Sequence, residues 1–82
     1  MILEIITPEK TYFNGEVDSI SLPGETGSFQ ILNNHAPIIS LLKNGILAFS
    51  VGDKEREVTI TDGFVEVNNN KVTILIDKVI GS

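Results

Sequence analysis

Turn-forming residues interrupt this chain at short intervals, which limits the kinds of element it can build. Combinations of Gly, Pro, Asn and Asp recur along the whole length: Thr7-Pro8, Asn14-Gly15, Pro23-Gly24, Gly27, Asn33-Asn34, Asn44-Gly45, Gly52-Asp53, Asp62-Gly63 and Asn68-Asn69-Asn70. The segments between them have roughly five to eight residues, which is shorter than a helix of average length. Such spacing is typical of short β-strands joined by tight connections.

Side-chain alternation within these segments supports strands. In the segment 64–67 valines at 65 and 67 alternate with Phe64 and Glu66, and similar alternation runs through 46–51 and 72–77. Period two over successive short segments predicts an all-β sandwich or barrel. The composition agrees, because Val, Ile and Leu total 26 residues against two Ala, and branched side chains pack well on a pleated sheet.

Two local features refine this prediction. Residues 63–77 are expected to form a hairpin whose loop, Asn68-Asn69-Asn70, tolerates left-handed backbone, and a strand at 55–61 precedes it. In the segment 16–22 the apolar side chains do not keep one alternation: Val17 has an odd sequence number, whereas Ile20 and Leu22 have even ones. An uninterrupted strand would point them to opposite faces, so we expect a β-bulge near Asp18-Ser19.

Length and charge exclude several classes of protein. The 82 residues allow one domain, 1–82, and carry six Lys+Arg against eleven Asp+Glu, for a net charge of −5. An acidic chain with scattered basic residues is a poor binder of nucleic acid. There is no Cys, no apolar run long enough to cross a bilayer and no signal-peptide pattern at the start, so the sequence predicts an intracellular protein without disulfides.

Residues 28–42 do not follow the alternation. Ala36-Pro37 favours an extended entry to the apolar run 38–42, because proline disfavours a helical residue before it. One thin sandwich cannot bury every apolar side chain in this segment. Part of the surplus is therefore expected to face a partner.

The residues offer little catalytic chemistry. His35 is the only His, and a satisfied loop residue is the favoured interpretation, because it lacks companion metal ligands and no nucleophile motif surrounds Ser28 or Ser40. Gly24–Ser28 resembles a phosphate-binding loop only superficially and is expected to be a connection between strands. Glu55 and Glu57 are interpreted as part of a solvent-exposed strand face, whose charges keep the sheet edge from pairing with another strand. We therefore expect no enzyme site, no metal and no cofactor.

A series of motifs resembles the epsilon subunit of F-type ATP synthases. The stretch Asn34-His35-Ala36-Pro37 with the following residues to Lys43-Asn44-Gly45 is similar to that family's "G-H-A-P-(apolar)…K-x-G" segment. The flanks match in order, with the opening strand at 5–9, "F-x-G-x-V" at 13–17 and a final strand pair at 62–77. The resemblance covers essentially the whole chain. It differs at Gln30, where the family usually has Gly, and at Asn33-Asn34, where the family has Pro-Gly.

The resemblance implies an all-β fold, a flattened two-sheet β-sandwich of roughly eight to ten short, mainly antiparallel strands. It also implies a non-catalytic rotor subunit that couples the gamma subunit to the membrane c-ring. Candidate c-ring contacts are Ser28, Gln30, Asn34 and His35. Candidate gamma-subunit contacts are Phe29, Ile31, Leu32, Ile38, Ile39 and Leu42, although core burial of at least two of Phe29, Ile31 and Leu32 is an equally good expectation.

The resemblance further implies a peripheral place on the cytoplasmic face of a bacterial inner membrane, reached only through partner subunits, in a proton- or sodium-translocating enzyme. The family's C-terminal helical hairpin, which carries ATP-binding and inhibitory roles, has no counterpart in these 82 residues, so neither role nor any small-molecule substrate is expected. The main alternative is a free-standing β-sandwich module that binds a peptide or glycan. A small hydrolase using His35 is a more remote alternative.

Overall fold

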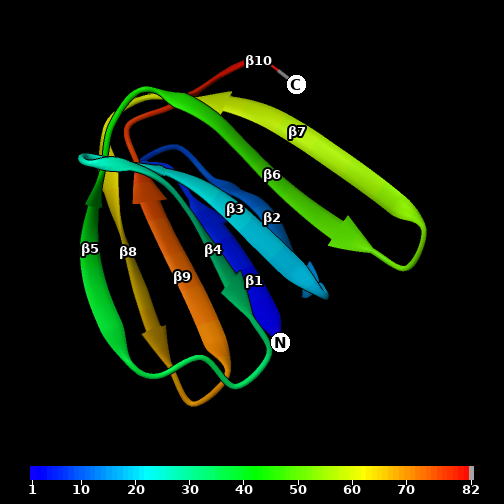
Figure 1. Cartoon of the computed structure of the whole chain (residues 1–82). Coiled ribbons are helices and arrows are strands. Elements are labelled where there is room, and N and C mark those ends of the chain that lie inside the picture. Colours follow the sequence, from blue (N-terminus) through cyan, green and yellow to red (C-terminus); the bar gives the residue numbers. More distant parts are fainter. Residues whose placement is uncertain (82) are drawn as a thin grey trace.

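The computed structural model describes residues 1–81, and every regular element in them is a strand (Figure 1). This confirms the all-β prediction. The ten strands are β1 (Ile2–Ile6), β2 (Thr11–Glu16), β3 (Ser19–Gly24), β4 (Gly27–Leu32), β5 (Ile38–Leu42), β6 (Gly45–Val51), β7 (Lys54–Ile60), β8 (Gly63–Asn68), β9 (Lys71–Ile76) and β10 (Val79–Gly81).

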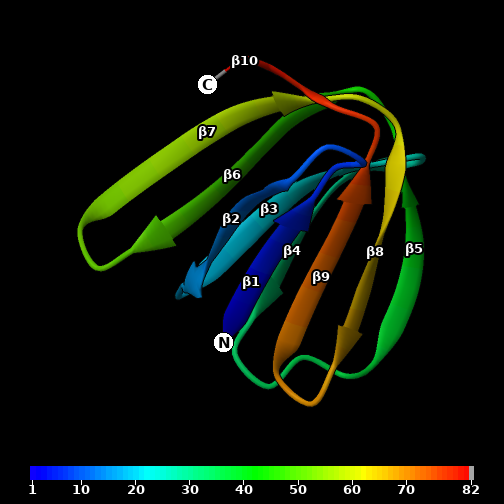
Figure 2. The ribbon, with the colours of Figure 1, turned by 180° about the vertical axis from the view of Figure 1, so that it is seen from behind.

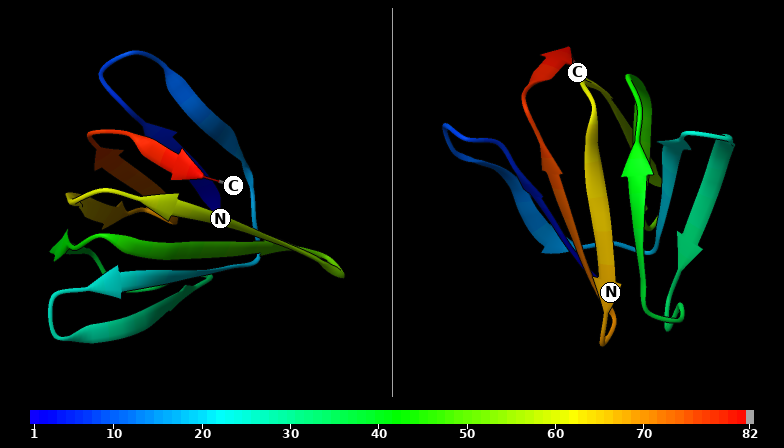
Figure 3. Two further views of the ribbon diagram at one scale, coloured as in Figure 1. Left: turned by 90° about the horizontal axis from the view of Figure 1, so that it is seen from above. Right: turned by 90° about the vertical axis from the view of Figure 1, so that its left-hand side faces the viewer.

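The strands form one hydrogen-bonded path that folds over into two layers. Its order is β10-β7-β6-β3-β5-β8-β9-β1-β2, with β4 pairing to β3. Strands β2, β1, β9, β8 and β5 make one layer, which Figures 1 and 2 show side by side, and β4, β3, β6, β7 and β10 make the other. Among residues 1–81 only β1 and β9 pair in parallel. The edge-on view in Figure 3 shows how the path curls from β2 round to β4.

A long bent ribbon connects the two layers. Strands β5 and β6 follow each other with only Lys43 and Asn44 between them, and their antiparallel partners β8 and β7 are separated by Thr61 and Asp62. The half of the ribbon made by the paired strands β5 and β8 therefore lies in one layer. The half made by β6 and β7 lies in the other. The bend at residues 43–45 and 61–63 is called the crease below. A single backbone pair, Gly24 with Leu42, joins β3 to β5 there.

The space between the layers is filled by apolar side chains from both. The fully buried ones alternate along their strands and include Leu3, Ile5, Ile20, Leu22, Ile31, Leu47, Val58, Ile60, Val65, Val67, Val72 and Ile74. Within residues 1–81 no polar or charged residue is buried. Burial of branched side chains on the inner faces of two sheets is the main source of stability for such a fold.

The predicted hairpin at 63–77 is present as β8 and β9. Its two loop residues Asn69 and Asn70 have positive φ angles of 51° and 60°. Asn adopts this left-handed region more readily than most residues because its short polar side chain can hydrogen-bond locally. The turn residues thus fix the register in which Val65 faces Ile74 across the hairpin.

The predicted β-bulge near Asp18-Ser19 is wrong, although the break in alternation behind it is real. Strand β2 ends at Glu16 and β3 starts at Ser19 in the other layer, so residues 17 and 18 carry the chain across the sandwich. The Val17 amide donates to Met1 O and the Asp18 amide to Ser50 O. Val17 and Ile20 both face the core because Val17 lies in this crossing segment, whereas Ile20 follows it in β3.

Candidate functional site

The outer face of the β5–β8–β9–β1 layer carries a continuous apolar row. Leu41 pairs with Phe64, Phe64 with Leu75, and Leu75 with Ile6, so four apolar side chains lie next to one another across four strands. Each alternates with buried neighbours on its own strand and therefore points away from the core. Leu41 is 57% exposed and Phe64 41%. We call Leu41, Phe64, Leu75 and Ile6 the apolar row.

A mixed row of side chains lies beside the apolar row on the same face. Ile39 pairs with Glu66, Glu66 with Thr73, and Thr73 with Glu4. Ile39 is 74% exposed, the highest value among the large exposed apolar residues of the described chain. Lys71 forms an ion pair with Glu4 at 3.6 Å. The outer face therefore has an apolar row next to a partly charged one, and protein interfaces likewise combine apolar and polar surface.

The outer face of the other layer is different in character. Along β3, β4 and β6 its outward positions are mainly small or polar, namely Ser19, Ser21, Ser28, Gln30, Ala48 and Ser50. Ser19 and Ser50 hydrogen-bond to each other at 2.7 Å across β3 and β6. Leu32, Ile46 and Ile80 are its large exposed apolar side chains among the residues described, and they lie on β4, β6 and β10, no two of which are paired. A large partner that buries apolar area would therefore favour the first layer.

An asparagine-rich end closes the sandwich beside His35. The amide of Asn34, whose φ is 64°, donates to Asn70 Oδ1 at 2.8 Å, which joins the loop before β5 to the β8–β9 turn. The His35 amide donates to Leu32 O at 3.2 Å, and its Nδ1 lies 2.7 Å from Ala36 O. A carbonyl only accepts, so Nδ1 carries the proton in that contact. His35 is thus a satisfied loop residue, as its sequence context favoured.

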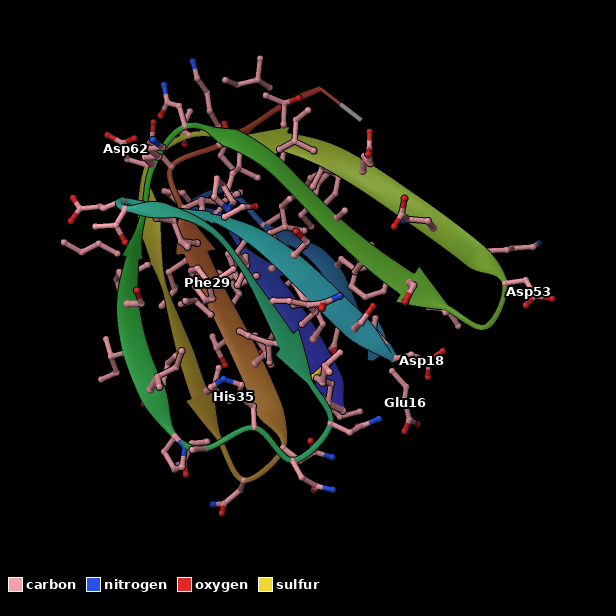
Figure 4. The ribbon with its side chains drawn as sticks, in the orientation of Figure 1. Glu16, Asp18, Phe29, His35, Asp53 and Asp62 are labelled. Atoms are coloured by element: carbon pink, nitrogen blue, oxygen red, sulfur yellow. The ribbon has the colours of Figure 1, made fainter. Side chains whose placement is uncertain are left out.

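The four candidate c-ring residues are not all gathered at one place. Asn34 and His35 lie at the asparagine-rich end, Gln30 is exposed in the middle of β4, and Ser28 is near the opposite end of that strand. Ser28 Oγ is 3.5 Å from Leu22 O, within its own hairpin. Figure 4 shows His35 at one end of β5 and Asp62 at the other. Only Asn34 and His35 therefore share a surface patch.

The six candidate gamma-subunit residues divide by burial. Ile31 and Leu42 are in the core, at 0% and 3% exposed, so their side chains cannot contact a partner in this fold. Phe29 and Ile38 are half-buried and pack against the core. Leu32 and Ile39 are exposed, but they lie on different layers. Of the six, Ile39 alone extends the face that holds the apolar row.

The sequence interpretation missed the apolar row itself. Phe64 and Leu75 occupy the outward parity of strands whose inward positions are also apolar. Apolar residues on both faces of a hairpin strand were the signal, since a strand with one solvated face would carry polar residues there. The pairing of four strands that brings the row together is not visible in the sequence.

The remaining candidate sites show no arrangement suited to catalysis. Gly24 and Gly27 end β3 and begin β4, so the glycine-rich segment is a hairpin turn between strands, as expected. Glu55 and Glu57 are exposed on β7, beyond the part of it that β10 covers. In residues 1–81 no three His, Cys, Asp or Glu side chains are grouped so as to hold a metal ion, and no helix is present that could cross a membrane.

Comparison with known proteins gives the family. The model of the "ATP synthase, Delta/Epsilon chain, beta-sandwich domain" family matches residues 1–82. The ATP synthase epsilon chain of Leptospira borgpetersenii is 44% identical over 75 residues, which are 92% of this chain and 59% of that protein. The epsilon chain of Chlorobaculum tepidum is 41% identical over 94% of this chain and 89% of its own length. The chain thus spans little more than half of the Leptospira relative and most of the Chlorobaculum one.

Solved structures agree with the sequence relatives. A chain of the Euglena gracilis mitochondrial ATP synthase superposes with a TM-score of 0.92 at 25% identity, over 99% of this chain and 52% of that one. A chain from the central stalk and c-ring of the Tetrahymena thermophila enzyme superposes with a TM-score of 0.86 at 23% identity and shows the shared fold. With a family model matched from end to end and relatives above 40% identity, this chain belongs to the β-sandwich domain family of ATP synthase delta and epsilon chains.

Proposed function

We propose that this chain acts as an epsilon-type, non-catalytic part of the central stalk of an F-type ATP synthase. The family match over residues 1–82 supports this role, and the curated relatives are named ATP synthase epsilon chains. A stalk part must transmit force between neighbours without making or breaking substrate bonds. A sandwich with a fully apolar core and paired strands supplies the stiffness for this task.

The apolar row is the observation that carries the proposal. Leu41 and Phe64 expose apolar area on one sheet face, close to the crease, and Ile39 extends it. Water-exposed apolar surface of this kind is stabilised by covering it with a partner. The gamma subunit is the partner that we propose for this face. Of the earlier candidates only Ile39 remains central to this interface, and Leu32 belongs to the other layer.

The asparagine-rich end is the proposed contact with the c-ring. Asn34 and His35 present polar groups there, in a loop held by the hydrogen bond to Asn70. Polar side chains on a loop suit the polar connecting loops of a membrane ring, with water between them. Gln30 would lie at the margin of such a contact and Ser28 outside it. The domain would then be peripheral, at the cytoplasmic face of the inner membrane, through its partners alone.

Capture of the gamma subunit tests this function with a matched pair of variants. Leu41 and Ile46 are 57% and 56% exposed, and they lie on the outer faces of different layers. We expect L41D to reduce co-purification of co-expressed gamma subunit at least tenfold and I46D to leave it unchanged, because a carboxylate at a buried interface lacks a partner. Thermal unfolding of both variants checks that they fold.

Two results would contradict the proposal. Equal loss of gamma binding in L41D and I46D would show that the apolar row is not the docking face. A wild-type chain that stays monomeric beside gamma subunit and instead retains a peptide or glycan would favour the free-standing binding module.

A further inference from the structure

The β6–β7 hairpin projects beyond the rest of the sandwich, and a groove lies along the half of the hairpin nearest its tip. Figures 1 and 3 show the tip of the hairpin extending past the neighbouring strands, and Figure 4 labels Asp53 at that tip. Phe49 pairs with Arg56, and Val51 with Lys54, so all four side chains share one face of the hairpin. Phe13 of β2 packs against Phe49 with ring centroids 4.5 Å apart. The residues lining the groove are Phe13, Phe49, Val51, Lys54, Glu55 and Arg56.

Aromatic rings hold the Arg56 guanidinium at this groove. Its Cζ atom lies 5.7 Å from the centroid of the Tyr12 ring and 5.9 Å from that of Phe13, with Phe49 also at 5.9 Å. Stacking on aromatic faces positions a guanidinium but leaves its N–H donors in the ring plane available for oxygen acceptors. Arg56 is therefore oriented without being neutralised.

The charge at the groove is opposite to that of the whole molecule. Lys54 and Arg56 line the groove in a chain of net charge −5, and Lys10 lies outside it, 5.8 Å from the centroid of the Tyr12 ring that Arg56 also approaches. In residues 1–81 none of these three cations has a carboxylate within 4.0 Å, the only ion pairs being those of Lys71 and the N-terminus. Glu55 lies at the rim, between the two cations in sequence, and alternates to the opposite face of β7.

The apolar floor and the cationic rim together define the chemistry of an occupant. Half-buried Phe13, packed on the buried Phe49 ring, forms an aromatic floor, and Val51 is 50% exposed beside it, which suits an apolar side chain. Arg56 and Lys54 suit a carboxylate beside that side chain. We propose that this groove is a second docking site, separate from the apolar row, for an acidic partner-protein segment in which an apolar residue neighbours a carboxylate.

Nuclear magnetic resonance with a defined peptide tests the site. The ¹⁵N-labelled 82-residue chain is titrated with an acetylated and amidated hexapeptide of alternating leucine and glutamate, and with the matching leucine–lysine peptide. We expect saturable amide shifts concentrated at Phe13 and residues 49–56 with the acidic peptide alone. Inorganic phosphate, added to give the same concentration of negative charge as the acidic peptide, is expected to bind at least tenfold more weakly than that peptide. Phosphate leaves the apolar floor uncovered.

Variants decide whether Arg56 and Lys54 are responsible for binding of the acidic peptide. R56Q and K54Q are each expected to weaken the acidic peptide at least fivefold, while E57Q, on the outward face of the same strand, leaves its affinity unchanged or slightly higher. K54Q alters an exposed side chain and keeps the test valid if R56Q unfolds. Equal binding of the basic peptide or of phosphate, or unchanged affinity in K54Q and in any folded R56Q, would overturn the proposal. Because gamma capture is not involved, this result is independent of the proposed function.

Discussion

The backbone amide of Asn44 donates a hydrogen bond to Asp62 Oδ1, at 3.0 Å, across the crease where the bent ribbon passes between layers. The two residues lie in the two connections that interrupt the ribbon, so neither has a sheet partner of its own at this point. A second bond, from the Lys43 amide to Pro23 O, ties the same bend to β3. The angle between the layers is thus fixed by side-chain and turn bonds in place of a continuous ladder.

Removing the Asp62 carboxylate should loosen the crease. We expect D62A to lower the free energy of unfolding by about 1 kcal/mol, because the Asn44 amide loses its acceptor. Urea denaturation measures the change. D53A removes the same charge at the exposed tip of the β6–β7 hairpin and should change stability by less than about 0.5 kcal/mol. Equal effects of the two variants would show that the hydrogen bond contributes nothing beyond charge.

Gly63 is the glycine of the crease with the least room for a side chain. A Cβ atom placed there would lie 2.0 Å from Leu75 O and 2.8 Å from Ile76 Cγ2. We expect G63A to lower the free energy of unfolding by about 3 kcal/mol, since backbone in a paired strand must move. Gly81 has no atom within 4 Å of its Cβ position, so G81A serves as the control in thermal unfolding. A G63A protein as stable as G81A would contradict the packing described at the crease.

The β8–β9 turn should depend on backbone conformation at Asn69. Its φ is 51°, a region that costs most residues about 1 kcal/mol. We therefore expect N69A to destabilise the chain by about 1 kcal/mol and N69G to leave it at least as stable as wild type. Asn68 is exposed in the strand with an ordinary φ, so N68A should have little effect in the same denaturation series. Destabilisation by N69G would argue against a conformational origin.

The sequence predicted local structure better than long-range pairing. Turn residues and alternation gave the β8–β9 hairpin and the all-β class, because both depend on neighbours in the chain. The break in alternation after Val17 was visible, but its cause, a passage between layers, depends on the pairing of Ser19 with Ser50 far along the chain. Local patterns do not distinguish a bulge from a change of sheet.

The candidate site was predicted less well for the same reason. Ile31, Leu42 and Ile39 lie in one apolar-rich stretch, and only the fold separates the buried pair from the exposed residue. The apolar row and the contact of Arg56 with the Tyr12 ring each join residues from strands that are distant in sequence. No motif marks such surfaces. His35 itself, by contrast, was interpreted correctly as a satisfied loop residue, because its own hydrogen bonds are to the nearby residues Leu32 and Ala36.

Two adjacent isoleucines separate folding from docking. Ile38 packs against the core, whereas Ile39 is 74% exposed beside the apolar row. Substitution by Asp should therefore lower folding stability at Ile38 and binding of the gamma subunit at Ile39. I38D should lower the free energy of unfolding by about 3 kcal/mol, because a carboxylate would be placed against apolar neighbours. I39D should change stability by less than about 0.5 kcal/mol and weaken capture of the gamma subunit at least fivefold.

Urea denaturation and gamma capture, measured on both variants, check this pair. Comparison with I46D, an equally polar change on the other layer, controls for a general effect of added charge on capture. If I39D unfolds as readily as I38D, then Ile39 is not a surface residue. If I39D is stable and binds gamma subunit as wild type does, then the face that holds Leu41 and Phe64 is not where the stalk docks, and the partner must use another surface of the sandwich.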